Sequence, residues 1–569
     1  MAVTIARAVG GLFLAFICYK LGIIFYNAFL HPLAKFPGPK SVATGWYKTV
    51  EEIFKGRNWT DCLKELHSKY GEIVRVGPNE LHFSNPNAFH EIYNNANRWD
   101  KEETLYHCFG EDRSSFGFLT YKEAKQRKDV LAPLFSKRAI GDLQGLVKKN
   151  IERLCVALEK DGKTNKSSDM LFALRCFTLD VVTQYCFAKD VKSTEAKDFQ
   201  APIVIAMDAS LPGFVVFRHF EAVRQIVFSL PGWLTKLTNP ALAGLVDLQE
   251  LLGTQVNEVV NNAQTLQKTP HATIYHRLMD QEANKATGVP SPGSLYEEAQ
   301  ALFFGGAESS GNTTMIGIYH ILQSPAVLRR LKEELHSIWP DRNTIPPLEH
   351  LEKLPYLTAI IKESLRLSPS VPAPLPRIVP SAGASISGEK IPGGTCVGQS
   401  LIFVHYSKTT FDSPQTFDPE RWLQPSSASL EKWMAVVSWP SLSFADMQKV
   451  RMRKLHHADD YEDLNADRLI TSFSLKHRQT FKMGDPGRSG LHMTSSRNGD
   501  RYPGELFRGS AGHQYYAGSL SLRSMRTRRT VVEVKNSSAD ATKFLSAMDN
   551  SHTSEKSENC TSIPARPDF

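Results

Sequence analysis

Apolar residues dominate the start of the chain. From Ala8 to Leu30 nearly every position is apolar, and Lys20 and Asn27 are the interruptions. About 20 consecutive apolar residues are enough for a helix to cross a bilayer. Because a signal peptide would have a shorter apolar core and a cleavage site of small residues, the pattern predicts an uncleaved membrane anchor over residues 1–30. An amphipathic helix lying on the membrane surface is the alternative.

After residue 30 the pattern predicts a hinge and then an alternation of helices and short strands. The three prolines of residues 31–40 prevent the anchor helix from continuing and make a stiff hinge, and the body of the protein follows from residue 41. Strands are predicted at Glu72–Val76, Glu80–Ser84, Ala384–Ile391 and Thr395–Val404. Helices are predicted at Asp61–Tyr70, Lys122–Ser136, Leu171–Phe187, Asp247–Val260, Phe303–Leu322, Pro325–Trp339 and Leu354–Leu367. The predicted fold class is mainly α-helical with small β-sheets.

The helical segment Phe303–Leu322 has an unusual centre. Glycine occupies positions 305, 306 and 311, and each costs about 1 kcal/mol relative to alanine inside a helix. Glu308 and Ser309 put a carboxylate and a hydroxyl where apolar packing is expected. Because such local costs are kept at functional sites, the segment is a candidate site. The alternative is a structural helix whose glycines allow close packing and whose Glu308 faces water.

A second apolar segment, Ala201–Leu237, lies between two predicted helices. A second membrane contact or a lipophilic access channel is one hypothesis for this segment, because an extended apolar surface marks an interaction site. Ordinary hydrophobic core is the other.

Composition and charge narrow the class of protein. The net charge is +8, and after Trp439 roughly 20 Lys and Arg stand against roughly 15 Asp and Glu, so the body is close to neutral. This balance does not indicate a nucleic-acid partner. The eight cysteines show no Cys-x-x-Cys pair and no metal-ligand spacing, which is typical of buried thiols in a reducing compartment. They stand at 18, 62, 108, 155, 176, 186, 396 and 560.

Charged residues at three places along the chain are candidates for a functional role. Glu363 and Arg366 stand three apart and share a helix face, although a surface ion pair of under about 1 kcal/mol is the common alternative. Arg127 and Lys128 belong to a basic helical run, which on its own is usually a solvated face. Arg377 follows a run of prolines.

The order of these motifs resembles one enzyme family. The anchor, the hinge, Gly305–Ser310, the Glu363-x-x-Arg366 pair and the loop Phe417–Trp422 occur with familiar spacings. Together they are similar to the eukaryotic heme-thiolate monooxygenases, the cytochrome P-450 family, and to its membrane-bound fungal members of secondary metabolism. The resemblance covers about residues 8–438 and implies the cytochrome P-450 fold for the body.

The resemblance also implies roles for the candidate residues. It implies a proton-delivering acid–alcohol pair at Glu308 and Ser309, heme propionate contacts at Arg127, Lys128 and Arg377, and a buried charge triad of Glu363, Arg366 and Arg421. A hydroxyl beside a carboxylate can organise water for proton transfer, and cations bind propionates through charge-assisted hydrogen bonds. Two positions depart from the family: Ser309 replaces the usual threonine, and Ala124 stands where a histidine is often found.

Cofactor, partners and location follow from the same resemblance. It implies heme, electrons from an NADPH-dependent reductase, and a lipophilic substrate such as a terpenoid or a polyketide. Specificity is expected in the loop Tyr106–Thr120 and in Ala201–Leu237. The expected location is the endoplasmic reticulum, as a single-pass membrane protein whose body faces the cytosol.

The sequence departs from the family where the heme ligand is expected. Family members follow the Phe417–Trp422 loop with a Phe-x-x-Gly-x-Arg-x-Cys-x-Gly signature, whose thiolate binds the heme iron. Here no cysteine stands between Val397 and Asn559, Cys396 belongs to a predicted strand and Cys560 to the terminal tail. No metal ligand is therefore predicted.

Residues 439–569 also change in composition, with more Ser, Arg, Gly and His and little apolar periodicity, which predicts a disordered tail. A changed reading frame or splice near Ser438 is one explanation, and a genuine regulatory tail is the other. Two functions stay open: a heme monooxygenase, or a catalytically inactive membrane-tethered pseudoenzyme that lacks the axial cysteine.

Overall fold

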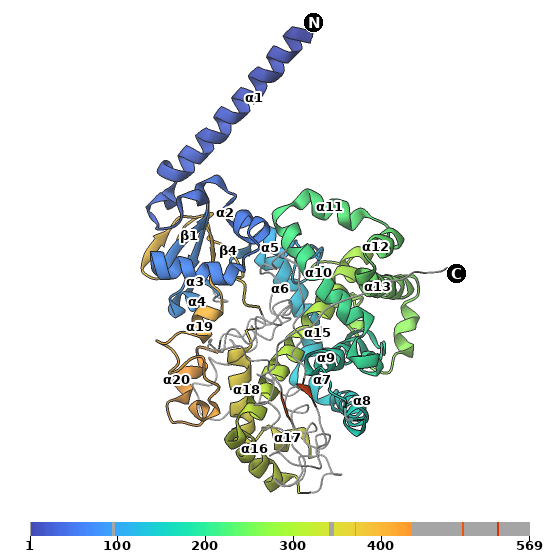
Figure 1. The fold of residues 1–569 in the computed structure, drawn as a ribbon. Helices are drawn as coiled ribbons and strands as arrows, with labels where there is room; N and C mark the ends of the chain where they lie inside the picture. Colours follow the sequence, from blue (N-terminus) through green and yellow to red (C-terminus); the bar gives the residue numbers. More distant parts are fainter. Residues whose placement is uncertain are drawn as a thin grey trace, which may run out of the picture.

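The computed structural model describes residues 2–434, except 94–96, 165, 341–345 and 370, and two short strands at 492–493 and 532–533. The predicted tail of residues 439–569 otherwise lies outside the described residues. The body is a large array of helices with a small sheet at the side where the chain enters it (Figure 1). This architecture confirms the prediction of a mainly helical fold with small sheets.

The helices are α1 Ala2–Phe25, α2 Tyr47–Thr49, α3 Trp59–Tyr70, α4 Pro86–Ile92, α5 Glu103–Tyr106, α6 Tyr121–Leu131, α7 Lys137–Asp142, α8 Gln144–Lys163, α9 Met170–Phe187, α10 Pro202–His219, α11 Glu221–Ser229, α12 Gly232–Thr238, α13 Ala243–Asn261, α14 Ile274–Leu278, α15 Pro292–Gln323, α16 Pro325–Ile338, α17 Leu348–Leu351, α18 Pro355–Leu367, α19 Ile402–His405 and α20 Ser427–Glu431. The strands are β1 Ile73–Gly77, β2 Glu80–Phe83, β3 Asp100–Lys101, β4 Arg377–Ile378, β5 Ala384–Ile386, β6 Glu389–Ile391, β7 Cys396–Gly398, β8 His492–Met493 and β9 Val532–Glu533.

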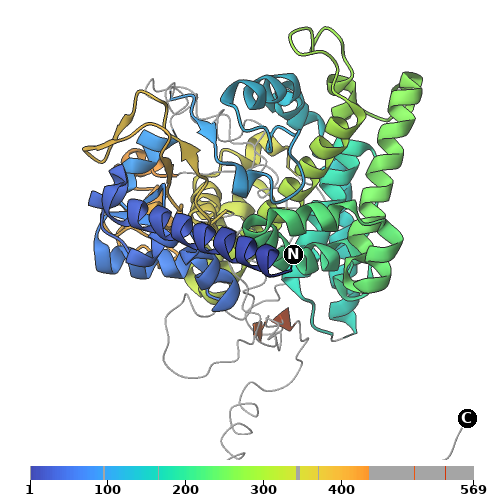
Figure 2. The same cartoon turned by 90° about the horizontal axis from the view of Figure 1, so that it is seen from above.

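Helix α1 projects from one side of the body (Figures 1 and 2). Three described segments are long and apolar enough to cross a membrane: Thr4–Leu30, Met170–Phe187 and Lys197–His219. Met170–Phe187 is largely buried within the body and Lys197–His219 is half buried, whereas Thr4–Leu30 has no buried part. Because an apolar helix with no protein cover needs another apolar environment, α1 and the turn after it form the segment suited to a bilayer.

The proline-rich hinge is held against the sheet. Arg75 on β1 donates from Nη1 to the carbonyl oxygen of Asn27 at 2.8 Å, and its backbone N–H donates to Pro37 at 2.8 Å. Asn27 in turn donates to the carbonyl oxygen of Ala43 at 3.1 Å, and Leu33 is fully buried. The end of the anchor is therefore fixed on the body by side-chain as well as backbone hydrogen bonds.

The main sheet joins segments that are distant in sequence, in the order β1-β2-β7-β4-β3. The predicted hairpin is confirmed as β1 and β2, which pair antiparallel. Strand β7 then pairs parallel to β2 and antiparallel to β4. The predicted strand Thr395–Val404 is too long, because the chain leaves the sheet after Gly398 and forms the helical turn α19.

Helix α15 runs through the centre of the core and packs against α9, α13 and α18. Two of its glycines, Gly306 and Gly311, face α9. A Cβ atom on Gly306 would lie 2.6 Å from Cγ2 of Val182, and one on Gly311 would lie 3.1 Å from Oγ1 of Thr178. Both contacts are with α9, so these glycines allow the two helices to approach closely, as the structural alternative expects.

The apolar segment Ala201–Leu237 divides into two parts. In α10 the residues that face the other helices are buried, including Val204, Met207 and Leu211. In α11 and α12 no residue is buried, and Trp233 and Leu237 are 66% and 72% exposed. The first part is therefore ordinary core, and only the second presents an apolar surface.

The glycine contacts predict opposite effects of alanine at two helical positions. Gly306→Ala is expected to destabilise the protein by about 1–3 kcal/mol, because its Cβ overlaps Val182. Gly253→Ala in α13 is the matched control, since no described atom lies within 4 Å of its Cβ position, and it is expected to stabilise by about 0.5–1 kcal/mol. Thermal unfolding in detergent measures both, and equal shifts in Tm would contradict the packing argument.

Candidate functional site

Glu308 lies in the middle of α15 and does not face water. It is 1% exposed, which makes the solvent-facing alternative wrong. Its Oε1 accepts a hydrogen bond from Nη2 of Arg175 on α9, and Nη1 of the same arginine donates to Oδ1 of Asp208 on α10 at 2.7 Å. Within the described residues, Oε2 of Glu308 has no hydrogen-bond partner. One arginine therefore links the carboxylates of two helices.

Ser309 has a different environment from its neighbour. Its hydroxyl donates to the carbonyl oxygen of Gly305, one turn earlier in α15, at 2.9 Å. Thr313 and Thr314 make the same contact with the carbonyls of Ser309 and Ser310. The hydroxyl of Ser309 is thus held by its own helix, and its bond is not with Glu308.

The surroundings of Glu308 favour its protonated form. Burial raises the pKa of its carboxyl, the charge of Arg175 and its hydrogen bond lower it, and the charge of Asp208 raises it again; the result is a pKa of about 8. A carboxyl of this pKa carries a proton at neutral pH and can release it, which is the property required of a proton donor.

Glu363 lies at the centre of a buried charge network. The carboxylate is fully buried and accepts hydrogen bonds from Nη2 and Nε of Arg366 at 2.7 and 2.9 Å. Nε of Arg421 donates to it at 3.1 Å, and Trp422 Nε1 at 2.9 Å. Arg366, also fully buried, donates in addition to the carbonyl oxygen of His405. The surface-pair alternative is therefore wrong.

The arginines determine the charge of Glu363. Burial raises the pKa of its carboxyl, but the hydrogen bonds and charge of Arg366, followed by the charge of Arg421, outweigh burial and hold the pKa below its ordinary value of 4.5. A carboxyl with a lowered pKa contributes stability that is present above pH 4.5 and is lost as the pH falls through the folded-state pKa.

The three cations predicted to hold heme propionates have protein partners. Nη1 of Arg127 on α6 donates to Glu298 of α15 at 3.0 Å, and its Nη2 to Ser294 at 2.9 Å. Arg377 on β4 donates to the hydroxyl of Tyr106. The structure places Lys128 half-buried on α6, one residue after Arg127. Arg127 therefore contacts the first part of α15, and Arg377 contacts the last residue of α5.

Sequence reasoning missed two of these partners. Arg175 lies in the apolar run of α9, and Glu298 in the apolar first half of α15. A charged residue in a helix that is otherwise apolar signals a buried ion pair, because an unpaired charge there would be costly. That signal was present in both helices, but the sequence gives no means of choosing the partner.

The positions of the cysteines decide whether one of them can serve as the thiolate ligand of a heme iron. Six of the seven described cysteines are buried and the other, Cys18, lies in α1. Cys396 lies within β7 between two strands, and burial raises the pKa of its thiol far above the ordinary value. Cys176 and Cys108 donate to the carbonyls of Phe199 and Leu105 at 3.1 Å each.

Within the described residues no group of three His, Cys, Asp or Glu side chains could hold a metal. Cys560 lies outside the described residues, and the sequence has no other cysteine after Cys396. The arginines suited to propionates already bind protein groups. The residues that the structure describes therefore do not fit a heme with a thiolate ligand.

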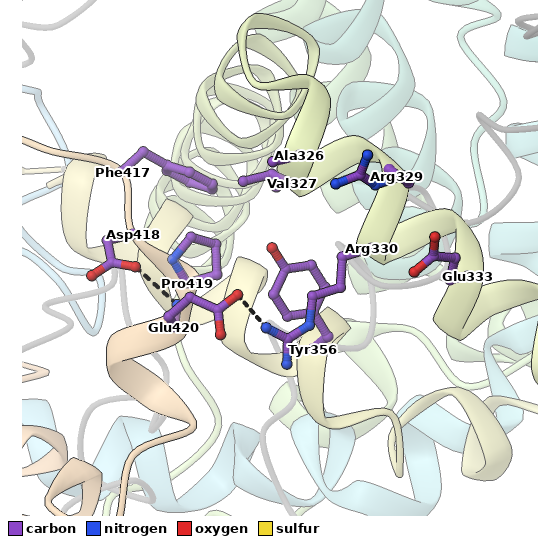
Figure 3. A pocket seen from close by; sticks show the side chains of 10 residues that line it. All are labelled: Ala326, Val327, Arg329, Arg330, Glu333, Tyr356, Phe417, Asp418, Pro419 and Glu420. Carbon is purple, nitrogen blue, oxygen red and sulfur yellow. Dashed lines mark hydrogen bonds and ion pairs between the residues drawn. The ribbon is translucent and has the colours of Figure 1, made fainter. Parts of the chain in front are cut away.

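A pocket of about 360 Å³ lies on the outer side of the Glu363 network, between α16, α18 and the turn Pro419–Trp422 (Figure 3). Arg330 lies there between the carboxylate of Glu420 and the ring of Tyr356, 4.4 Å from its centroid. None of the lining residues comes from α10 or α15. The pocket is therefore separate from the candidate site at Glu308.

Comparison with known proteins identifies the class. The fold is mainly α-helical with a buried Glu-x-x-Arg network, and the family model for cytochrome P450 matches residues 42–435. The chain belongs to the cytochrome P450 family.

Curated relatives are fungal cytochrome P450 monooxygenases. The chain is 34% identical over 445 residues to flvC of Aspergillus flavus, an alignment that covers 72% of this chain and 82% of the relative. It is 31% identical over 414 residues to macH of Penicillium terrestre, covering 72% and 81%. It is 30% identical over 440 residues to tpcC of Cochliobolus heterostrophus, covering 76% and 82%.

The charge network predicts a large effect of one substitution. Glu363→Gln is expected to destabilise the protein by about 3–5 kcal/mol, because it leaves two buried arginines without their counter-charge. Glu389→Gln is the matched control: its pair with Lys35 has side chains 49% and 56% exposed and contributes under about 1 kcal/mol. Chemical unfolding at pH 7 measures both, and a similar loss in the two variants would contradict the assignment.

Proposed function

We propose that the body of this chain is the scaffold of a heme monooxygenase that hydroxylates or epoxidises a lipophilic compound of fungal secondary metabolism, such as a terpenoid or a polyketide. Dioxygen and electrons from an NADPH-dependent reductase are the co-reactants. The observation that carries the proposal is the fully hydrogen-bonded Glu363 network in a chain that the cytochrome P450 model matches over residues 42–435. Glu308, with its raised pKa, is the proposed proton donor.

A second function is favoured by the absence of any cysteine between Val397 and Asn559. Without a thiolate for the heme iron, the polypeptide is a membrane-tethered protein with no monooxygenase activity. Altered splicing or a changed reading frame near Ser438 reconciles the two functions. In that case the gene encodes the enzyme, whereas this polypeptide lacks the part that carries the heme-binding cysteine. Sequencing transcripts across codons 435–450 tests this explanation.

Carbon monoxide difference spectroscopy of the reduced protein distinguishes the two functions. The full chain is expected to lack the red-shifted Soret band of a thiolate-bound heme, because it lacks the ligand. A chimera in which the residues after Ser438 are replaced by the matching segment of the Aspergillus flavus relative is expected to show that band.

The control for this experiment is the same chimera with its signature cysteine changed to alanine, which removes the ligand alone. A folded chimera without the band would contradict the monooxygenase scaffold. A thiolate band from the unaltered chain would contradict the second function.

The proposal includes two contacts with the membrane of the endoplasmic reticulum, with the body facing the cytosol. Helix α1 is the first. The second is the apolar surface of α11 and α12, and α11 lies on the side of the body from which α1 projects (Figure 1). The large exposed apolar residues of this surface and its connections are Val223, Ile226, Phe228, Leu230, Trp233 and Leu237.

Binding to phospholipid vesicles tests the second contact. In a chain that begins at residue 31, the double change Trp233→Ser and Leu237→Ser is expected to weaken binding about tenfold or more, because two exposed apolar side chains are lost. Val156→Ser is the control, since Val156 is 65% exposed on α8, away from α1 (Figure 1). Equal binding by all variants in a flotation assay would contradict the contact.

A further inference from the structure

Three charged side chains from three helices meet at Arg175. Its side chain is 1% exposed and donates to Glu308 of α15, which is equally buried. The other end of its guanidinium donates to Asp208 of α10 at 2.7 Å, and that side chain is 21% exposed. Asp208 is therefore the member of the group that lies at the edge of the core.

One buried cation cannot neutralise two ionised carboxylates at once. When Asp208 is ionised and paired with Arg175, an ionised Glu308 would leave a net negative charge in the core, which is unfavourable. Glu308 then keeps its proton. The charged groups that act on Glu308 are Arg175 from α9 and Asp208 from α10, and their effects on its pKa are opposite.

The two contacts of Arg175 differ in rigidity. Helices α9 and α15 are held together by the close approach at Gly306 and Gly311, and by the hydroxyl of Thr178, which donates to the carbonyl oxygen of Ala307. Helix α10 packs mainly against α13, contains Pro212, and continues into the exposed helix α11. The distance from Arg175 to Glu308 is therefore fixed by packing, and the distance to Asp208 depends on where α10 lies.

We propose that Asp208 is a positioning residue that acts through Arg175 to set the charge of Glu308, and so couples proton delivery to the position of α10. When α10 lies against α9, Asp208 occupies Arg175 and Glu308 is protonated. When α10 moves outward, Arg175 pairs with Glu308 alone, the Glu308 proton passes to solvent water, and the carboxylate remains. The inference rests on the proposed proton donor but needs no heme.

Infrared spectroscopy of the full chain in detergent tests the coupling. The C=O stretch of protonated Glu308 is followed against pH and assigned by its loss in Glu308→Gln. In the unaltered chain the midpoint is expected near pH 8. Asp208→Asn is expected to lower the midpoint by at least one unit, a tenfold change in proton affinity, because the amide carries no charge.

Two further variants make the result specific. Asp208→Glu retains the charge and is expected to restore the midpoint toward that of the unaltered chain. Asp247→Asn removes an exposed carboxylate that pairs with Lys236 on the surface and is expected to leave the midpoint unchanged. An unchanged midpoint in folded Asp208→Asn would overturn the inference. The titration is read without heme, so its failure is distinguishable from a failure of the proposed function.

Discussion

Several buried carboxyl groups of this protein are paired with arginines from distant segments, and these pairs fix how the segments meet. Helix α15 is apolar along most of its length, yet Glu298 and Glu308 lie inside the core. The first is matched by Arg127 of α6 and the second by Arg175 of α9. Apolar packing alone tolerates sliding of one helix along another, whereas these pairs are satisfied at one register only. The ion pairs therefore specify the position of α15 between its neighbours.

A third buried carboxylate links the segment that follows α1 to α10. Glu52, 1% exposed, accepts from Arg218 and from His219 at the end of α10, and Thr49 holds the other nitrogen of that histidine at 3.0 Å. The end of α10 is thus fixed beside the segment that follows the anchor. Its middle, which carries Asp208, lies between this fixed end and Ala201. A motion of α10 that separates Asp208 from Arg175 would therefore have to bend or rotate the helix about the end that pairs with Glu52.

Local patterns predicted the elements of the fold well. The β1–β2 hairpin and the helices α9, α13, α16 and α18 lie within a few residues of their predicted bounds, because periodicity and turn residues act over short ranges. The excessive length predicted for β7 has the same origin, since the apolar run continues after Gly398 into a helical turn. Nothing in the local pattern marks where pairing with β2 and β4 ends.

Partners across the fold could not be predicted in the same way. The sequence showed that Glu363 and Arg366 share a helix face, but whether that face is buried depends on Arg421 and Trp422, more than fifty residues later. For Glu308 the local pattern allowed either water or the core. The choice was decided by Arg175, which is 133 residues earlier in the chain. The family resemblance predicted that Glu363 is buried, but it predicted no ion-pair partner for Glu308.

The charge networks of Glu363 and Glu308 are formed by residues that precede the position where the heme-binding cysteine is expected. Both carboxylate oxygens of Glu363 are satisfied by residues 366–422, and the arginine that pairs with Glu308 stands at position 175. The change of composition near Ser438 therefore takes no partner from either carboxylate. The hydrogen bonds of Glu363 and Glu308 therefore do not depend on the sequence that follows Ser438.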